Sequence, residues 1–516
     1  MSVAWARGAR RWWPLATVAT VVVGLALAGV LPRWPGLAQE VALPPLDLLT
    51  DIRVLVAEAP SPVVFVAGLA AALTVRVIML TLLLGRSLRR PGFALRFYAV
   101  AMPPGLVAAA LDVSARAVLY AYLLWAGLLV TLVAFVALAA APWTGLGGLR
   151  GALARAWHDR LRIAALVPYL FGLAVLGAVV RRPGEAIQVV VVPASALLTA
   201  AAATRLSAAP ARRVSGRAVA AIVTAVLATG VVLVAVARGD RGAPPRPPPR
   251  EGSLLLVAGV DTSSGAGALY RLDPRALGYS CAQTSYFSYA GTGSGTPQRD
   301  ATCPIRRGAP YRRADTLRPL PALAETFRHQ VAALPRPVTV VTHSQGAWIA
   351  WAALSPGRAT GVRGLVMLGP FSESLAAYPP PGRGGRGAVA GVAVRAVTDL
   401  GAAIGFSTFD PDAPLARQLQ ATPGAVEALL DRPLSRQVRV AAVLSRWDLP
   451  LVPGGWPRGV SESCPGWSAH GGLPSAALAL DAASRFLEHR TPGDCPVWVR
   501  ALGHATQAFG APPPHG

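Results

Sequence analysis

The first 237 residues contain seven apolar segments of about the length that crosses a lipid bilayer. They cover residues 14–31, 63–84, 97–111, 117–143, 163–180, 186–203 and 218–237. A membrane-spanning helix needs about 17 to 25 mostly apolar residues, since no water is present in the bilayer to satisfy the backbone. The third segment is the shortest, and Pro103-Pro104-Gly105 interrupts it. The pattern predicts an all-α transmembrane bundle of about seven helices over residues 1–237.

Arginine clusters predict the orientation of this bundle. They precede the first segment and follow the second, fourth and sixth, and they comprise Arg7, Arg10, Arg11, Arg86, Arg89, Arg90, Arg96, Arg150, Arg155, Arg160, Arg162, Arg205, Arg212, Arg213 and Arg217. The loop after the first segment is instead acidic, with Glu40, Asp47, Asp51 and Glu58. The positive-inside rule places every cluster in the cytoplasm only if all seven segments cross. We therefore expect a multi-pass protein of the cell membrane, with a cytoplasmic N-terminus and everything after residue 237 outside.

Two features of the bundle leave alternatives open. The first segment has a basic start and a Gly-Leu-Ala ending at Ala38, so it is either a first helix or a cleaved signal peptide. Arg76 lies well inside the second segment, and a charge within a membrane span is a functional hypothesis by default. The interpretation that we favour is an Arg that faces the bundle or extends to the inner headgroups.

Composition excludes disorder and a purely soluble enzyme. Hydrophobic residues make up 53% of the chain and charged residues only 14%, whereas soluble domains carry about a quarter. The net charge of +24 comes entirely from Arg, since the sequence contains no Lys. Most Arg residues of the first half lie in short loops between apolar segments, and the second half does not alternate basic and aromatic residues. No nucleic-acid partner is predicted.

The chain changes character at residues 238–251, which read RGDRGAPPRPPPRE. The prolines favour an extended polyproline linker that holds a second domain a little way off the membrane. In this second domain, residues 252–495, strands are predicted at 253–260, 284–289, 337–342, 364–368 and 437–444, and helices at 317–334, 347–354 and 475–487. Residues 496–516 remain as a C-terminal tail. Short apolar strands that alternate with helices favour an α/β fold, a mostly parallel sheet covered by helices.

The most informative motif is THSQG at residues 342–346, between a Val-rich strand and a helix. A serine in the middle of a sharp strand-to-helix turn is held in a strained backbone that exposes its hydroxyl. The N-terminus of the following helix favours an oxyanion beside that hydroxyl. Ser344 is therefore the predicted nucleophile.

On these residues the second domain resembles the α/β-hydrolase superfamily, closest to its lipase and esterase branch. Residues 340–347 are similar to the nucleophile elbow of that family, with Thr342 where the family usually has Gly. The resemblance implies an α/β-hydrolase fold fused to the polytopic membrane domain, with cleavage of ester bonds and no cofactor or metal.

The family's chain order is nucleophile, acid, histidine. The serine needs an imidazole to take its proton, and the imidazole needs a carboxylate to orient it. Asp448 follows the predicted strand 437–444 and His470 precedes the last helix, as this order requires. The alternative for Asp448 is a surface ion pair with Arg446. Rival acids that follow no clear strand are Asp399, Asp410 and Asp412, and the histidines at less suitable places are His158, His329, His343, His489, His504 and His515.

The resemblance also implies an oxyanion hole and a lid. The oxyanion hole of the family uses the amide after the nucleophile and one from a loop after an early strand, here Gln345 and Val260, with Asp261 as the neighbouring alternative. Residues 370–436 form an insertion with a Gly-rich stretch at 382–387 and an apolar stretch at 388–406. An apolar lid beside a bilayer suggests a lipid-like substrate. A plain helical cap packed on the sheet is the equal alternative.

All four cysteines lie in the second domain, which fits two disulfides outside the cytoplasm and does not resemble a zinc site. Sequence proximity favours Cys281–Cys303 and Cys464–Cys495, although four cysteines allow three pairings.

The sequence thus predicts a membrane-anchored serine hydrolase outside the cytoplasm, whose partners are the bilayer and an ester or lipid-like small molecule. The rival class is a non-catalytic transport or sensor protein that uses the hydrolase fold as a binding module. Thioester, amide and acyl-transfer chemistry, chain length and oligomeric state stay open.

Overall fold

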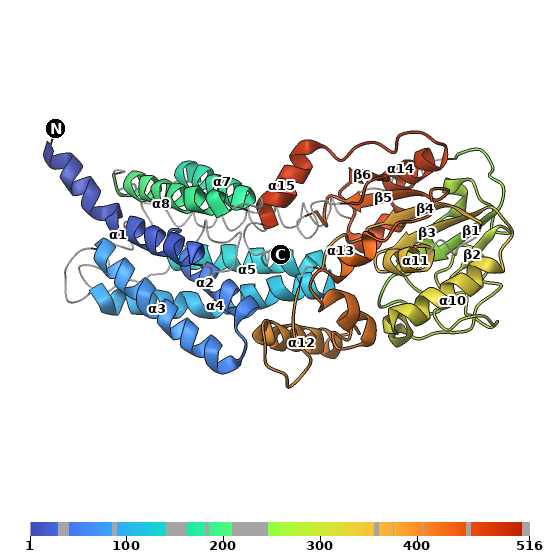
Figure 1. The fold of residues 1–516 in the computed structure, drawn as a ribbon, viewed down its shortest axis with the longest axis horizontal. Coiled ribbons are helices and arrows are strands. Elements are labelled where there is room, and N and C mark those ends of the chain that lie inside the picture. Colours follow the sequence, from blue (N-terminus) through green and yellow to red (C-terminus); the bar gives the residue numbers. More distant parts are fainter. Residues whose placement is uncertain are drawn as a thin grey trace.

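A computed structural model describes residues 2–28, 41–84, 90–140, 163–180, 185–208, 246–355, 361–374, 376–405, 407–449 and 456–507. Helices fill one end of the molecule and a parallel sheet with its covering helices fills the other (Figure 1).

The helices of the first half are α1 (Ser2–Leu27), α2 (Leu46–Glu58), α3 (Pro62–Leu84), α4 (Arg90–Val118), α5 (Ala121–Ala140), α7 (Ile163–Val180) and α8 (Glu185–Ala208). Six of the seven predicted apolar segments overlap these helices, and the seventh, 218–237, lies outside the described residues. Most of the Arg-rich loops that predict the orientation also lie outside the described residues. His158 belongs to one of these loops.

Within the described residues, two helices and not seven are long and apolar enough to cross a membrane. They are Pro62–Leu82 and Pro91–Val118, with mean hydropathies of 2.4 and 1.4. The other apolar helical stretches, Leu15–Leu25, Ala121–Thr131, Pro168–Gly177 and Val189–Ala203, are shorter than a bilayer crossing requires. Helix α4 continues through Pro103 and Pro104, so the segment with the weakest sequence signal is one of the two.

The acidic stretch that was predicted as an outer loop contains helix α2. Its Asp51 accepts two hydrogen bonds from the Arg76 guanidinium, both of 2.7 Å, and Asp47 accepts one of 2.6 Å from the Tyr98 hydroxyl. Arg76 and Asp47 are buried. A buried guanidinium is tolerable only when a carboxylate compensates its lost hydration. Arg76 therefore faces the bundle, and two acids of the predicted loop turn inward to meet it.

The second half contains one sheet of six parallel strands in the order β2-β1-β3-β4-β5-β6. The strands are β1 (Ser253–Val257), β2 (Thr284–Tyr286), β3 (Val338–His343), β4 (Val362–Leu368), β5 (Arg439–Ser445) and β6 (Val460–Gly466). This parallel sheet confirms the predicted α/β class for the second half. Strand β6 was not predicted because its sequence, VSESCPG, is polar and ends in Pro-Gly; it lies at the edge of the sheet, where only one neighbour must be paired.

One row of the sheet runs in register from Leu255 through Val340 and Leu365 to Val440. These side chains share an apolar cluster with Trp348, whereas the next residue along β3, Val341, belongs to a cluster on the other side. Helices α10 (Leu320–Ala332), α11 (Gly346–Leu354) and α13 (Ala425–Leu430) contribute to the first cluster, and α14 (Ala477–Leu487) contributes to the second. Both faces are covered, as a parallel sheet requires.

The predicted insertion 370–436 contains α12 (Ala388–Ala403), a π-helical turn (Ala416–Gln420) and α13. Helix α12 lies on the first half of the chain and not on the sheet (Figure 1). Ala390 is buried in a cluster with Leu48 and Phe93, Gly385 N donates to Pro60 O at 2.9 Å, and Arg386 pairs with Glu58 at 2.7 Å. Within the same insertion, α13 instead packs on the sheet, so the insertion contacts both the helical half and the sheet.

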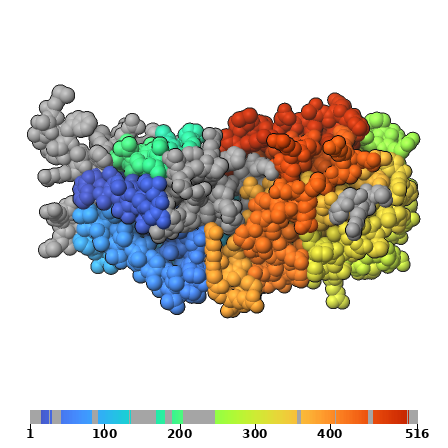
Figure 2. All heavy atoms as spheres, in the orientation of Figure 1, coloured from blue at the N-terminus to red at the C-terminus, as the bar shows by residue number. Residues whose placement is uncertain are grey.

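The two halves also share an apolar core. Ala115, Leu119 and Leu124 are buried in the same cluster as Trp348 and Phe371. Figure 2 shows the surface around α12 lying directly against that of the first helices. At the end of the predicted linker, Arg250 donates to the carbonyls of Leu277 and Leu487, both at 2.9 Å. The two halves are therefore in contact through residues far apart in sequence, while residues 238–245 of the predicted linker lie outside the described residues.

Both favoured disulfide pairings, Cys281–Cys303 and Cys464–Cys495, are confirmed. The predicted tail contains a helix, α15 (Val497–Gln507), directly after the second disulfide. The remaining short helices are 3-10 turns at Ala268–Arg271, Pro274–Leu277, Arg313–Leu317 and His470–Ser475.

Candidate active site

Ser344 lies at the bend between β3 and α11. Its φ angle is 54°, in the left-handed region that residues other than Gly rarely occupy. Such a conformation costs about 1 kcal/mol or more and persists only where the surroundings enforce it. Here the Ser344 amide donates to Leu368 O of the neighbouring strand at 2.9 Å, and the Ser344 carbonyl accepts from Ala347 N at 3.0 Å. The bend is therefore fixed on both sides.

Two glycines make room for this bend. A Cβ at Gly346 would lie 2.7 Å from Val257 O, and a Cβ at Gly259 would lie 2.9 Å from the Ser344 Cβ. Thr342, where the family that this motif resembles usually has Gly, is fully buried in β3. The left-handed bend forms with this β-branched residue in place.

His470 and Asp448 meet at the same edge of the sheet. The Nδ1 atom of His470 lies 2.6 Å from Asp448 Oδ2, and both side chains are mostly buried. Asp448 follows β5, and His470 begins the 3-10 turn before α14. The two loops are joined by a short hydrogen bond from the Ser445 hydroxyl to Ser468 O. The carboxylate is thus placed to hold one imidazole tautomer and to stabilise its charged form.

The alternative partner of Asp448 lies elsewhere. Arg446 donates to Cys464 O at 2.9 Å, and its guanidinium stands 5.9 Å from the centre of the Trp498 ring. The rival acid Asp412 is engaged by Arg395 at 2.7 Å. Among the described residues, the carboxylate bonded to the His470 ring is that of Asp448 and not that of Asp399, Asp410 or Asp412.

The His470 ring is held by three neighbours. It packs against His343 and Phe371, with ring centroids 4.7 and 5.2 Å away. A Cβ at Gly369, whose φ is +57°, would lie 2.9 Å from His470 Cε1. The ring therefore has a fixed place that depends on the absence of a side chain at residue 369.

His343 contacts His470, although its sequence position made it one of the less suitable histidines. Its Nε2 atom donates to the backbone carbonyl of His470 at 3.0 Å. Burial, together with the nearby His470, lowers the pKa of His343 to about 3, so its ring is neutral at physiological pH. The only available signal was its place beside Ser344 at the carboxyl end of a strand, where parallel α/β folds gather their functional groups.

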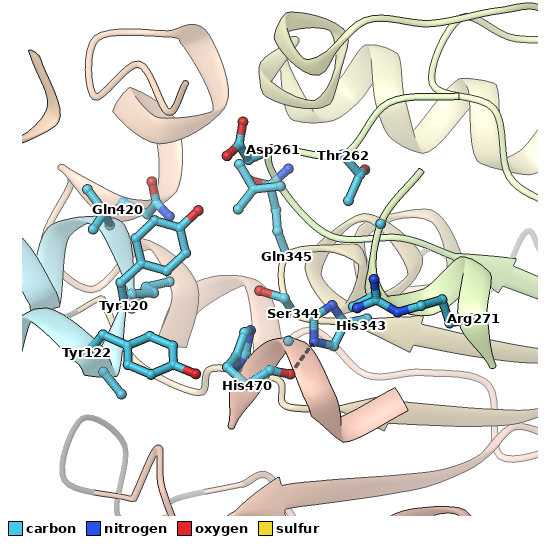
Figure 3. Close-up of a pocket in the computed structure, with 17 residues that line it drawn as sticks. Tyr120, Tyr122, Asp261, Thr262, Arg271, His343, Ser344, Gln345, Gln420 and His470 are labelled. Carbon is cyan, nitrogen blue, oxygen red and sulfur yellow. Dashed lines mark hydrogen bonds between the residues drawn. The ribbon is translucent and has the colours of Figure 1, made fainter. Parts of the chain in front are cut away.

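Ser344, His470, Gln345 and Val260 line one cavity of about 330 Å³. Figure 3 shows the Ser344 hydroxyl between His470 and Gln345, directed into this space. Asp448 stands behind His470 and does not line the cavity. Within the described part of the chain, no hydrogen bond joins the Ser344 hydroxyl to His470. Such bonds are often loose in a protein without substrate and tighten when it binds.

The predicted oxyanion donors, the backbone amides of Gln345 and Val260, both belong to residues of the cavity wall. The Gln345 side chain is turned to Thr316 O, to which it donates at 2.6 Å, so of its two amides only the backbone N–H is left for such a role. Asp261, the neighbouring alternative, has a φ of 59° and accepts hydrogen bonds from Thr408. A carboxylate in that position disfavours an oxyanion close to it.

The cavity also contains residues that the sequence did not indicate. They comprise Val118, Leu119, Tyr120, Ala121, Tyr122, Thr262, Gly267, Ala268, Arg271, Gln420 and Gly471, besides His343. The first five form the end of α4 and the start of α5, more than 200 positions before Ser344. No local pattern signals a contact over such a distance.

No metal site is indicated in the described ranges. Their one compact group of potential ligands is Glu462, Cys464 and Cys495, and the two cysteines form a disulfide. A disulfide offers no thiolate to a metal.

No protein-family model, curated protein or solved structure matches this chain.

Proposed function

We propose that this chain is a membrane-anchored serine hydrolase of the α/β-hydrolase superfamily, similar to lipases and esterases, which cleaves ester bonds through a Ser344–His470–Asp448 triad. One observation carries the proposal. Ser344, on a left-handed strand-to-helix bend, opens into the same cavity as His470, whose Nδ1 atom contacts Asp448. A strained serine beside a carboxylate-bound imidazole is the arrangement that nucleophilic acyl transfer needs.

In this mechanism Ser344 Oγ attacks the ester carbonyl while His470 Nε2 takes the hydroxyl proton. The negative charge that forms on the carbonyl oxygen is stabilised by the amides of Gln345 and Val260. The C–O bond of the ester then breaks, and the alcohol leaves with the proton from His470. Water attacks the acyl-serine with His470 again as the base, and the carboxylic acid and free Ser344 result. Asp448 stabilises the imidazolium in both halves of the cycle.

The proposal includes a multi-pass anchor with the active site outside the cytoplasm. Two junctions of the helical half meet the second half: residues 58–60 before α3, and residues 118–122 between α4 and α5. The Arg pattern places the loops before the second and after the third apolar segment outside. Residues 58–60 belong to the first of these loops, and residues 118–122 begin the fourth segment just after the second. The two disulfides further favour an oxidising location. Crossings beyond α3 and α4 rest on the sequence pattern.

The test is covalent labelling of the full-length, detergent-solubilised protein with a fluorophosphonate, which traps an activated serine. We expect labelling of the wild type, none of Ser344→Ala, and a decrease of at least about 10³-fold in the labelling rate of His470→Ala. Ser280→Ala is the matched control, since Ser280 is exposed and bonded to Gln283 away from the cavity.

Labelling that persists in Ser344→Ala would exclude this nucleophile. A folded wild-type protein that neither reacts with the probe nor hydrolyses any ester would instead favour the non-catalytic alternative.

A further inference from the structure

The helical half builds one wall of the cavity over Ser344. This wall, the α4–α5 turn, consists of Val118, Leu119, Tyr120, Ala121 and Tyr122. Figure 3 shows Tyr120 and Tyr122 on one side of the Ser344 hydroxyl and Thr262 and Arg271 on the other. The cavity therefore has an apolar and aromatic side supplied by the helical half and a more polar side supplied by the loops of the sheet.

The α4–α5 turn is firmly held in this place. Leu119 has a φ of 58°, a conformation that is costly for a branched residue, and it is buried in the apolar cluster that contains Trp348 and Phe371. The Tyr120 amide donates to Ala115 O at 3.1 Å, and the Leu123 amide donates to Tyr120 O at 3.0 Å. The strain shows that the packing fixes the backbone at this point.

The turn is also linked to the triad. The rings of Tyr122 and Trp125 lie 6.0 and 5.3 Å from the ring of Trp447, measured between centroids. Trp447 is buried and directly precedes Asp448. The start of α5 therefore packs on the loop that carries the acid.

The predicted lid contributes little to this wall. Of the described residues in the insertion 370–436, Gln420 alone lines the cavity, and α12 does not reach it. The sequence suggested α12 for substrate selection. This helix instead packs on α2 and α4, through residues such as Ala390.

We propose that the α4–α5 turn is the substrate-selecting wall of this site, and that the substrate is an amphiphilic ester. Its apolar acyl chain packs against Leu119, Ala121 and the ring of Tyr122, and its alcohol portion faces Thr262 and Arg271. A cavity of about 330 Å³ is at the lower end of the range for ligand pockets, so the acyl chain is of short to medium length. This inference rests on the proposed function.

The first test measures how esterase activity depends on the acyl-chain length of the substrate. It compares Tyr122→Ala with the wild type, both as full-length, solubilised protein. Removal of the Tyr122 ring enlarges the space for the acyl chain beside the α4–α5 turn. The kcat/KM for the dodecanoyl p-nitrophenyl ester, divided by that for the butanoyl ester, should therefore rise about tenfold or more. The ratio is compared rather than either absolute rate, because the Tyr122 ring also packs on Trp447 next to Asp448, and a disturbed triad lowers the rates for both esters alike. Phe171→Ala is the matched control, because Phe171 is an exposed aromatic residue on α7, away from the cavity.

The second test uses the wild-type protein and does not depend on a variant. An alkyl fluorophosphonate with a diazirine at the chain end is first bound to Ser344 and then photolysed. We expect cross-links in the peptide that contains residues 118–122. Cross-links confined to residues 388–405 would overturn the inference, because they would place the chain under α12.

The two levels of the proposal fail in different ways. If Ser344 is labelled but the profiles of Tyr122→Ala and wild type agree within twofold, the selecting wall is refuted and the hydrolase stands. If the wild type is not labelled at all, the hydrolase and the inference fall together.

Discussion

At the residue scale, the site depends on small distances around one imidazole. His470 is bonded to Asp448, packed between His343 and Phe371, and bounded by Gly369. Each neighbour restricts a different movement of the ring. Proximity effects in catalysis are sensitive to such restrictions, since a shift of about 1 Å in a reacting group costs about 10²-fold in rate.

Gly369→Ala should therefore lower kcat by about 10²-fold and leave the protein folded. The new methyl group would lie 2.9 Å from His470 Cε1 and displace the ring. Gly382→Ala is the matched control, because Gly382 also has a positive φ, of +74°, but no atom lies within 4 Å of its would-be Cβ. Equal activity of the two variants in an ester assay would contradict this role of Gly369.

His343 should make stability depend on pH. Its pKa is about 3 in the folded protein and 6.5 ordinarily, so the unfolded chain binds a proton first as the pH falls. The stabilisation is complete above pH 6.5 and is lost progressively as the pH falls from 6.5 towards 3. His343→Gln keeps a hydrogen-bond donor but cannot titrate. The free energy of unfolding of the variant should fall less steeply below pH 6.5, by up to about 1.4 kcal/mol per pH unit.

The measurement is the thermal midpoint of both proteins in detergent between pH 7.5 and 4.5. Groups common to both proteins titrate alike, so the difference in slope isolates His343. Parallel curves would show that His343 is not buried as a neutral ring.

At the element scale, strand β6 and helix α15 support the loop that carries Asp448. The disulfide Cys464–Cys495 fixes β6 to the chain just before α15, and both cysteines are buried with Leu444 and Leu449 on either side of Asp448. Cys281–Cys303 instead lies beside the beginning of β2, where no residue lines the cavity of Ser344. The two bridges close loops of similar length but have different neighbours.

We expect both disulfide deletions to reduce stability and only one to reduce activity. With sequence separations of 22 and 31 residues, each Cys→Ser pair should destabilise the fold by about 3 kcal/mol. At a temperature where both variants are folded, Cys464→Ser/Cys495→Ser should lose most of its esterase activity, and Cys281→Ser/Cys303→Ser should retain it. Thermal midpoints and ester hydrolysis measure the two effects. Retained activity in both would show that β6 does not support the acid.

At the scale of the whole molecule, the two halves form one body with the cavity between them. Leu119 and Leu124 are buried with Trp348, and Ala390 is buried with Leu48. Burial of apolar surface stabilises such an interface without any covalent link. We therefore expect the two halves to stay together without the covalent connection between them.

Cleavage of the linker should leave the halves together. With a protease site engineered into residues 238–245, the two fragments should co-elute in size-exclusion chromatography in mild detergent and keep the fluorophosphonate labelling of Ser344. Leu119→Asp, which buries a charge in the shared core, should make the fragments of the cleaved protein separate. Separation of the unmutated fragments would show that the shared core does not hold them.

Local patterns were sufficient for much of this protein. Hydropathy located six apolar segments that overlap helices, and short apolar or β-rich runs located five of the six strands. The strand–serine–helix motif located the bend at Ser344, and chain order selected Asp448 and His470, which lie 2.6 Å apart. These features are readable because backbone geometry and side-chain period are set by neighbours in sequence.

Tertiary structure decided the rest. The inward turn of Asp47 and Asp51 towards Arg76, the packing of α12 on the first half, the role of His343 and the wall formed by residues 118–122 all depend on partners that are distant in sequence. Within the described residues, two helices and not seven are long and apolar enough to span a membrane. The sequence by itself therefore located most of the helices and strands and the three residues of the candidate site, Ser344, Asp448 and His470. What surrounds them was decided by packing between distant segments, since burial energy depends on the complete set of contacts and not on any local period.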